Sequence, residues 1–188
     1  MSITKKTFYG SGSIYEFEYV TTGEGAITIP TTQAAIKTFV TTYAVEANQI
    51  GYLKNGFQVQ INATKLEDQS DLGEMKISLI SKEEGTINFS LFNANGATIS
   101  KLYPTAKTTS GVTVVGGLKG TAQKEHVILF VAADEAEGQT VFIAVGKNVS
   151  GFSLNWNPES VEPFPCEYSM IPYNTDGNLF VIGDLTKE

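Results

Sequence analysis

Residues 51–62 read Gly-Tyr-Leu-Lys-Asn-Gly-Phe-Gln-Val-Gln-Ile-Asn, and they open the most clearly patterned part of the chain, which runs to Pro104. From residue 57 onward apolar and polar side chains alternate, a pattern that is typical of a strand with one buried face. Asn55 and Gly56 stand between two apolar pieces and both tolerate a positive φ, so they predict a hairpin turn. This stretch therefore predicts a β domain.

An acidic segment follows this predicted hairpin. Residues 64–74 carry four carboxylates, Glu67, Asp68, Asp71 and Glu74. Their spacing lacks the alternating Asp and Asn positions and the terminal Glu of an EF-hand calcium loop. We therefore expect a solvated acidic loop here and not a metal site.

A second hairpin and a helix complete the patterned stretch. Residues 75–81 and 86–92 alternate like strands, and Gly85 between them suits the left-handed position of a turn. The residues that follow carry an apolar stripe at helical spacing, which predicts a helix that Pro104 ends.

Residues 21–50 are the least regular part of the chain. Short apolar pieces alternate with Thr-rich and Gly-rich pieces, so residues 32–40 fit either a helical turn or a strand. A long irregular segment inside a domain usually has a functional reason, and we expect an arm that becomes ordered against a neighbouring subunit. Residues 105–125, rich in Thr, Ser and Gly, are expected to form a variable loop.

The C-terminal third predicts more strands. Residues 126–133 are apolar enough for a core strand, and residues 140–145 predict the strand that returns beside it. Residues 166–173 and 179–182 are expected to pair across an Asp-Gly turn. Strands at regular intervals with little helix between them favour a sandwich or a closed barrel. We therefore expect one mainly β domain over residues 1–188, a β-sandwich or barrel with one flanking α-helix and a long extended arm or loop.

Composition and charge narrow the function classes. The chain has 188 residues, a formal net charge of −7 and one cysteine, Cys166. An acidic chain is a poor match for proteins that grip nucleic acid through phosphate contacts, which need clustered Lys and Arg. The N-terminus has no apolar run behind its lysines and does not predict a signal peptide, and the longest apolar run, residues 127–133, is too short to span a bilayer. We expect a protein made and kept in a cytosol, without an intrachain disulfide.

No catalytic pattern stands out. The single histidine, His126, lies far from Cys166 in the sequence, so a Cys–His nucleophile pair would depend on the fold. The simpler interpretation is that Cys166 is a small buried hydrophobic residue and that His126 lies at a strand end. The chain has no phosphate-binding loop, dinucleotide fingerprint or zinc-site spacing. We expect no enzyme, no cofactor and no metal.

Four consecutive elements carry a family pattern: the 51–56 hairpin, the Asp68-Gln69-Ser70 loop, the Thr-Ile-Asn-Phe-Ser-Leu strand at 86–91 and the helix that ends Lys-Leu-Tyr at 101–103. In this order they resemble the tail tube (major tail) proteins of tailed bacteriophages. Residues 179–184, Leu-Phe-Val-Ile-Gly-Asp, also look like the closing strand of that family.

The resemblance implies a β-sandwich with a flanking helix, assembled as hexameric rings that stack into a tube through which DNA is ejected into the host. The partners would be other copies of the chain and the tape-measure, terminator and baseplate proteins of the tail. DNA would be only a transient, non-specific cargo, and no membrane would be contacted. The protein would be a structural component of the virion tail, assembled in the cytoplasm of a bacterial host.

A neutral polar strand face fits the wall of such a tube. The outward residues of the predicted 57–62 and 86–92 strands are uncharged, and we expect the following to face the lumen: Gln58, Gln60, Asn62, Asn88 and Ser90. Such a surface holds water without a cationic grip on phosphate. We expect the acidic segment around Glu67 to be a loop between subunits or beside the lumen. The alternative for the neutral face is an ordinary solvated sheet surface.

Other functions stay open. Exposed aromatic residues such as Tyr9, Tyr15, Tyr43 or Trp156 would suit a carbohydrate-binding β-sandwich module. A hydrolase on a β scaffold is a further alternative, and the lack of a convergent His or Cys pairing counts against it. Within the phage class, a contractile-tail tube protein, a baseplate hub or a terminator protein would also fit.

Overall fold

The computed structural model describes residues 12–69, 76–92, 96–103, 105–116, 123–132, 139–149, 151 and 163–185. Its elements in chain order are β1 (Gly12–Glu18), α1 (Gln33–Tyr43), a 3-10 turn (Glu46–Asn48), β2 (Gln49–Gln69), β3 (Lys76–Leu91), α2 (Gly96–Leu102), β4 (Ala106–Thr109), β5 (Val112–Val115), β6 (His126–Ala132), β7 (Gln139–Asn148), β8 (Phe164–Ile171) and β9 (Phe180–Leu185). The prediction of a mainly β fold is confirmed.

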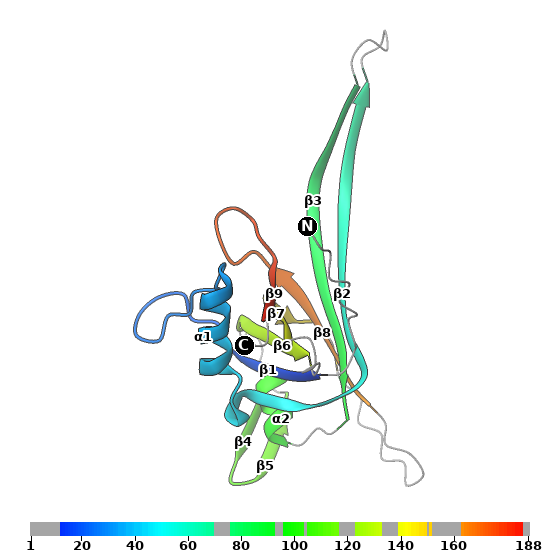
Figure 1. The fold of residues 1–188 in the computed structure, drawn as a ribbon. Helices are drawn as coiled ribbons and strands as arrows, with labels where there is room; N and C mark the ends of the chain where they lie inside the picture. Colours follow the sequence, from blue (N-terminus) through cyan, green and yellow to red (C-terminus); the bar gives the residue numbers. More distant parts are fainter. Residues whose placement is uncertain are drawn as a thin grey trace.

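Six strands close into a barrel (Figure 1). Antiparallel pairing runs in the order β6-β1-β2-β3-β8-β7, and β6 also pairs with β7, which closes the ring. β7 pairs with β9 over its first half and with β8 over its second half. β8 and β9 therefore lie end to end along the edge of β7 that does not pair with β6. Closure removes the free strand edges that an open sheet would expose. Of the two predicted architectures, the chain adopts the closed barrel.

Aromatic and aliphatic side chains fill the barrel. Tyr168, Ile87 and Leu91 are fully buried in this cluster, and Phe57 stacks on Phe130 with ring centroids 4.5 Å apart. Burial of one such side chain stabilises the fold by roughly 1.5–3 kcal/mol. The barrel interior is therefore the main source of stability.

Helix α1 covers the outer face of β6 and β7. Thr32 caps the helix by accepting a hydrogen bond from the N–H of Ala35 (3.3 Å). Ile36 and Phe39 are buried in a second apolar cluster against these strands. The prediction of an extended arm over residues 21–50 is therefore wrong for residues 33–43, which form a helix that packs on its own barrel. A contact of this segment with a neighbouring subunit stays a prediction. The helical alternative for residues 32–40 is the one that the chain adopts.

The first predicted hairpin turn is a bulge. β2 continues through Asn55 and Gly56, which have φ of 70° and 86°. Both residues take the positive φ that predicts a turn, but the pieces on either side pair with the same strand, β3, through Leu53 and Phe57. The strand therefore bends at this point and does not reverse.

The second predicted turn and the acidic loop are also strand. Gly85 is buried within β3, where an added Cβ would lie 2.6 Å from Sδ of Met170 on β8. This glycine permits close packing and does not provide a turn. Residues 64–69 of the predicted acidic loop belong to β2, and residues 70–75 lie outside the described part. β2 and β3 thus form one long hairpin where the sequence predicted two hairpins joined by a loop.

The predicted helix before Pro104 is confirmed as α2. Part of the variable loop predicted over residues 105–125 is a separate hairpin, β4–β5, around Ser110 and Gly111, whose φ values are 50° and 81°. The remainder of that segment includes residues 117–122, which lie outside the described part.

The predicted pairing of residues 126–133 with 140–145 is confirmed by β6 and β7. The Asp-Gly turn is also present, with Gly177 at φ 82° and the N–H of Tyr173 donating to the carbonyl of Asn178 (3.0 Å). The strands on either side of that turn both pair with β7 and not with each other, which corrects the predicted hairpin. None of the described helices is long and apolar enough to cross a membrane.

Candidate functional site: a polar sheet face and a projecting arm

Beyond the barrel, β2 and β3 continue as a two-stranded arm (Figure 1). We define the arm as residues 62–68 and 76–84, whose side chains are all exposed. One bulge interrupts its pairing at Ser81, whose hydroxyl donates to the carbonyl of Thr64 (3.1 Å). The pairing of β3 with β8 begins only at Thr86. In the described part of the chain, both edges of the arm are therefore unpaired.

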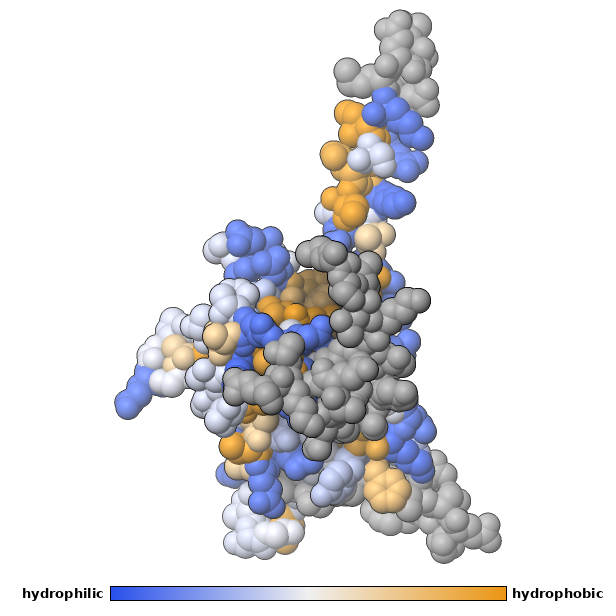
Figure 2. All heavy atoms as spheres, in the orientation of Figure 1, coloured by the Kyte–Doolittle hydropathy of each residue, from blue (hydrophilic) through white to orange (hydrophobic). Residues whose placement is uncertain are grey.

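The bulge determines which arm residues share a face. Residues directly opposite each other in a sheet point the same way, so Leu66 lies on one face with Leu79, and Ile77 lies on that face opposite Asp68. We call Leu66, Ile77 and Leu79 the apolar face of the arm, and they are 55%, 45% and 57% exposed. Ile80 points to the other side. Figure 2 shows apolar atoms gathered along one side of the arm and polar atoms along the other.

The predicted lumen residues all lie on one outer face of the sheet. Gln58 pairs with Asn88, and Nε2 of Gln60 donates to Oδ1 of Asn62 (3.1 Å). Ser90 lies on the same side of β3, and the alternate residues of both strands fill the barrel. The structure therefore brings together Gln58, Gln60, Asn62, Asn88 and Ser90, which we call the polar face. That this face lines a lumen stays a prediction.

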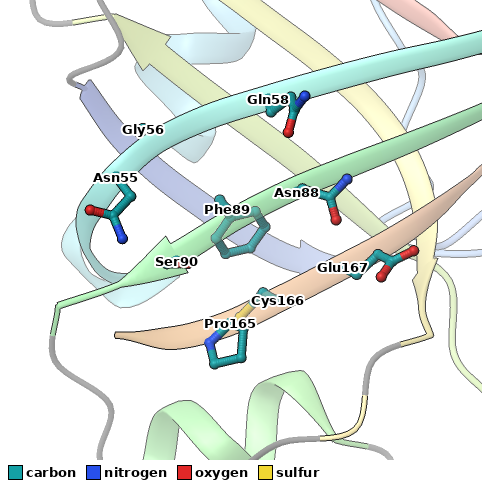
Figure 3. Close-up of a pocket in the computed structure, with 9 residues that line it drawn as sticks. All are labelled: Asn55, Gly56, Gln58, Asn88, Phe89, Ser90, Pro165, Cys166 and Glu167. Carbon is teal, nitrogen blue, oxygen red and sulfur yellow. The ribbon is translucent and has the colours of Figure 1, made fainter. Parts of the chain in front are cut away.

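A shallow, open depression of about 310 Å³ lies on the polar face (Figure 3). It is lined by Asn55, Gly56, Gln58, Asn88, Phe89, Ser90, Pro165, Cys166 and Glu167. Glu167 on β8 lies directly opposite Asn88 and places a carboxylate beside the uncharged residues of the polar face, while Lys54 lies opposite Ser90 at its edge. Glu167 was not among the predicted residues, although the alternation within residues 164–171 places it on the face away from the buried side chains. None of the lining residues is a Lys or Arg.

The acidic residues predicted in a loop separate into two groups. Glu67 and Asp68 lie in β2 on opposite faces of the arm, and Oγ of Ser78 donates to Glu67 (3.5 Å). The predicted loop is wrong for these two residues, because pairing with β3 outweighs the low strand propensity of acidic side chains. Asp71 and Glu74 lie outside the described residues.

A group of ionisable side chains at one end of the barrel was not predicted. Glu16 on β1 is only 2% exposed, and its Oε1 lies 2.5 Å from Nδ1 of His126, away from the direction of a good hydrogen bond. Burial, with the nearby charge of Glu16, raises the pKa of Tyr168. Nδ2 of Asn148 donates to the carbonyl of Leu102 (3.0 Å), which ties this end of the barrel to α2.

A hollow of about 390 Å³ opens beside this ionisable group. Its rim carries Lys124, which pairs with Glu18 at 2.7 Å, and Lys101, which donates to the carbonyl of Ala47. The rim charges thus contact groups of the protein itself. Among the described residues, no group of three or more His, Cys, Asp or Glu side chains could hold a metal ion.

The sole cysteine lies inside the barrel. Cys166 is 3% exposed, and burial, together with the charge of Glu16, raises the pKa of its thiol far above the ordinary range. A thiol held neutral in this way is a poor nucleophile. The prediction of Cys166 as a small buried hydrophobic residue is confirmed, as is that of His126 at a strand end.

The aromatic residues considered for carbohydrate binding have other contacts. Tyr43 stacks on Phe17 with ring centroids 4.5 Å apart and an interplanar angle of 10°, and Tyr15 packs in the same cluster under α1. Tyr9 and Trp156 lie outside the described residues. The two described rings therefore support the fold and do not form an open platform.

No protein-family model and no curated protein matches this sequence. The polar face and the arm, both within the stretch that carries the family resemblance, are the features from which a function can be inferred.

Proposed function

We propose that this protein is a structural subunit that self-assembles into hexameric rings, and that the rings stack into a tube similar to a phage tail tube, the conduit for DNA ejection. The resemblance of residues 51–104 to tail tube proteins supports this proposal. In such an assembly the partners are further copies of the chain together with tape-measure, terminator and baseplate proteins. The protein would then be located in the virion tail.

The observation that carries the proposal is the exposed arm. An isolated two-stranded hairpin is marginally stable in water, and unpaired edges with exposed aliphatic side chains promote association. The arm has two unpaired edges in the described part and three such side chains on one face, Leu66, Ile77 and Leu79. A lone soluble domain gains nothing from this arrangement, whereas a subunit of an assembly gains an interface.

The polar face supports the second part of the proposal, a channel for DNA. Gln58, Gln60 and Asn88 are polar and uncharged, and Glu167 beside them adds a negative charge. Lys54 lies opposite Ser90 at one edge of this face, with its ammonium group over the ring of Phe92. The part of the face formed by Gln58, Gln60 and Asn88 carries no cation to hold phosphate, and a carboxylate weakly repels phosphate. Nucleic acid could pass such a wall without adhering to it.

Electron microscopy of the purified protein tests the proposal. We expect rings or tubes in negative stain at high protein concentration. The matched control is a chain in which residues 65–81 are replaced by Asn-Gly, because Thr64 and Lys82 already pair directly and a two-residue turn can join them. We expect this variant to keep the barrel, measured by circular dichroism and urea unfolding, and to form no tubes.

Two results would contradict the proposal. Wild-type protein that stays monomeric at high concentration across a range of salt would contradict self-assembly. Tubes formed equally well by the variant without the arm would show that the arm is not part of the interface.

A further inference from the structure

We propose that the apolar face of the arm docks on the β4–β5 hairpin of a second copy of the chain, in a head-to-tail contact. This inference rests on the self-assembly proposed above and names the surface that receives the arm.

The β4–β5 hairpin presents an exposed face with two valines and a lysine. Lys107 pairs with Val114 and Thr109 pairs with Val112, so these four side chains point the same way. Both valines are 64% exposed. We call Lys107, Val112 and Val114 the valine face. Exposed β-branched side chains on a short hairpin form a flat apolar surface that a second strand pair can cover.

The opposite face of this hairpin is held by α2. Oγ1 of Thr108 donates to the carbonyl of Gly96 (3.0 Å) and lies 2.8 Å from Oγ1 of Thr113. A Cβ on Gly96 would lie 2.1 Å from Oγ1 of Thr113, which demonstrates how closely helix and hairpin approach. A surface that is already ordered loses little conformational entropy when a partner binds. The valine face is therefore prepared for docking.

The two surfaces match in shape and chemistry. Each is one face of an antiparallel strand pair, and each combines exposed aliphatic side chains with a charge of opposite sign. Asp68 lies opposite Ile77 on the arm, and Lys107 lies opposite Val114 on the hairpin. Docking would bury aliphatic surface on both sides and would bring a carboxylate toward an ammonium group.

The charges beside the apolar residues orient this match. Asp68 shares the face of Leu66 and Ile77 on the described arm, whereas Lys65 and Lys76 lie on the other face. Complementary charges such as those of Asp68 and Lys107 increase the rate of encounter and fix the orientation of two partners.

The position of the two surfaces selects a second copy as the partner. The arm projects from one end of the molecule, and α2 with β4 and β5 lies at the opposite end (Figure 1). A contact between unlike patches at opposite ends leaves one patch of each kind open after every addition, so it repeats into a ring or filament. One chain therefore carries both halves of a repeating contact.

Cysteine cross-linking tests the contact directly. Leu66→Cys and Val114→Cys chains are mixed and oxidised mildly, and the disulfide-linked dimer is measured over time on a non-reducing gel. The matched control replaces Leu66→Cys by Glu67→Cys, which lies on the other face of the arm. The wild-type chain, whose only cysteine is buried, is the blank. We expect the first mixture to form the dimer about tenfold faster than the control, because docking raises the effective concentration.

A charge exchange tests the same contact without cysteines. Asp68→Lys and Lys107→Asp should each raise the protein concentration needed for assembly by about tenfold, since each juxtaposes like charges. The double variant should recover most of the loss.

The outcomes separate this inference from the proposed function. Assembly of wild-type protein with equal cross-linking in both mixtures, or with no recovery in the double variant, would overturn the docking site and leave the assembly intact. Faster dimer formation by Leu66→Cys alone would indicate an arm-to-arm contact and would also overturn it. Selective cross-linking without tubes would support the docking site and count against the tube. No assembly and no cross-linking would overturn both.

Discussion

The barrel and the arm share two strands, β2 and β3, and differ in almost every physical respect. Within β3, Ile87 is fully buried in the barrel, while Ile77 on the arm is 45% exposed. In the barrel, neighbours pair both edges of β3 and one face is covered by the core. On the arm, the same strand has one partner and both faces are open. The barrel therefore stabilises the chain, and the arm leaves an exposed surface that another molecule can bind.

Because of this difference, the sequence of the barrel is constrained by folding, whereas the sequence of the arm is constrained by association. A substitution in the barrel changes the free energy of unfolding of a single chain, because it opens a cavity or unpairs a buried group. A substitution on the arm leaves a single chain nearly unchanged and alters only association. Matched substitutions in the barrel and on the arm should therefore have different effects on the free energy of unfolding, and equal effects would mean that the two regions are not distinct.

The largest expected contrast is between Ile87→Ala and Ile77→Ala, the same substitution at two positions of β3. Ile87→Ala should destabilise the chain by about 2–5 kcal/mol, because it creates a cavity in the packed barrel. Ile77→Ala should stay within about 0.5 kcal/mol of wild type, since its side chain is 45% exposed and fills no packed core. Urea unfolding of the monomer measures both. Equal losses would mean that the arm packs on its own barrel in solution.

A second contrast compares a buried contact with an exposed ion pair. His126→Ala removes the neighbour of the buried Glu16 side chain and should destabilise the chain by about 1–3 kcal/mol, because a buried polar group loses its neighbour and a cavity remains. Lys124→Ala breaks the pair with Glu18, whose two side chains are at least half exposed, and should change stability by less than about 1 kcal/mol. Glu16→Gln in the His126→Ala chain should restore part of the loss. Thermal unfolding that ranks Lys124→Ala as the more severe change would contradict the burial of Glu16 against His126.

Local patterns predicted the faces of strands better than their partners. The alternation at Phe57 and Val59 and at Ile87 and Phe89 correctly placed these side chains toward the core, since period-two alternation follows from strand geometry alone. The polar face followed from the same alternation. Pairing depends on distant segments, which is why the positive φ at Asn55 gave a bulge and not the predicted turn.

The length of the arm and the buried ionisable group had no local signal of their own. Residues 75–81 predict a strand, but acidic residues such as Glu67 and Asp68 predict a loop, and only their pairing with β3 makes them strand. Alternation along β1 places Glu16 on the opposite face of the strand from Tyr15 and Phe17. In a closed barrel with a helix outside, both faces of β1 are covered, so Glu16 became buried. The sequence of the Thr-rich segment that forms α1 fits either a helical turn or a strand, because its helix propensity is weak and the packing of Ile36 decides the outcome.

The third prediction concerns alkaline pH and again sets the barrel against the surface. The pKa values of Tyr168 and Cys166 are raised in the folded chain from ordinary values of 10.0 and 9.0, chiefly by burial. Both groups ionise first in the unfolded chain, so stability is full below pH 9 and falls as the pH rises above it. Each such group removes up to about 1.4 kcal/mol per pH unit above its ordinary pKa.

Tyr168→Phe should therefore flatten the loss of stability between pH 9 and pH 11. The control is Tyr52→Phe, at a position that is 64% exposed, and it should leave the slope as in wild type. Urea midpoints measured across this range provide the comparison. A slope that Tyr168→Phe leaves unchanged would contradict the burial of its hydroxyl group.

The smallest expected effect on stability is at the polar face, where substitutions should change DNA binding and leave the free energy of unfolding almost unchanged. Gln58→Lys with Gln60→Lys should change the free energy of unfolding by less than about 0.5 kcal/mol, because both side chains are exposed. The two added cations should nevertheless increase DNA binding by assembled protein, and the increase should disappear at high salt as phosphate contacts are screened. Gln58→Glu with Gln60→Glu is the control and should bind DNA no better than wild type. Fluorescence anisotropy with a short duplex at low and high salt measures the effect, and equal binding by all three chains would place the polar face away from any path that DNA takes through the assembly.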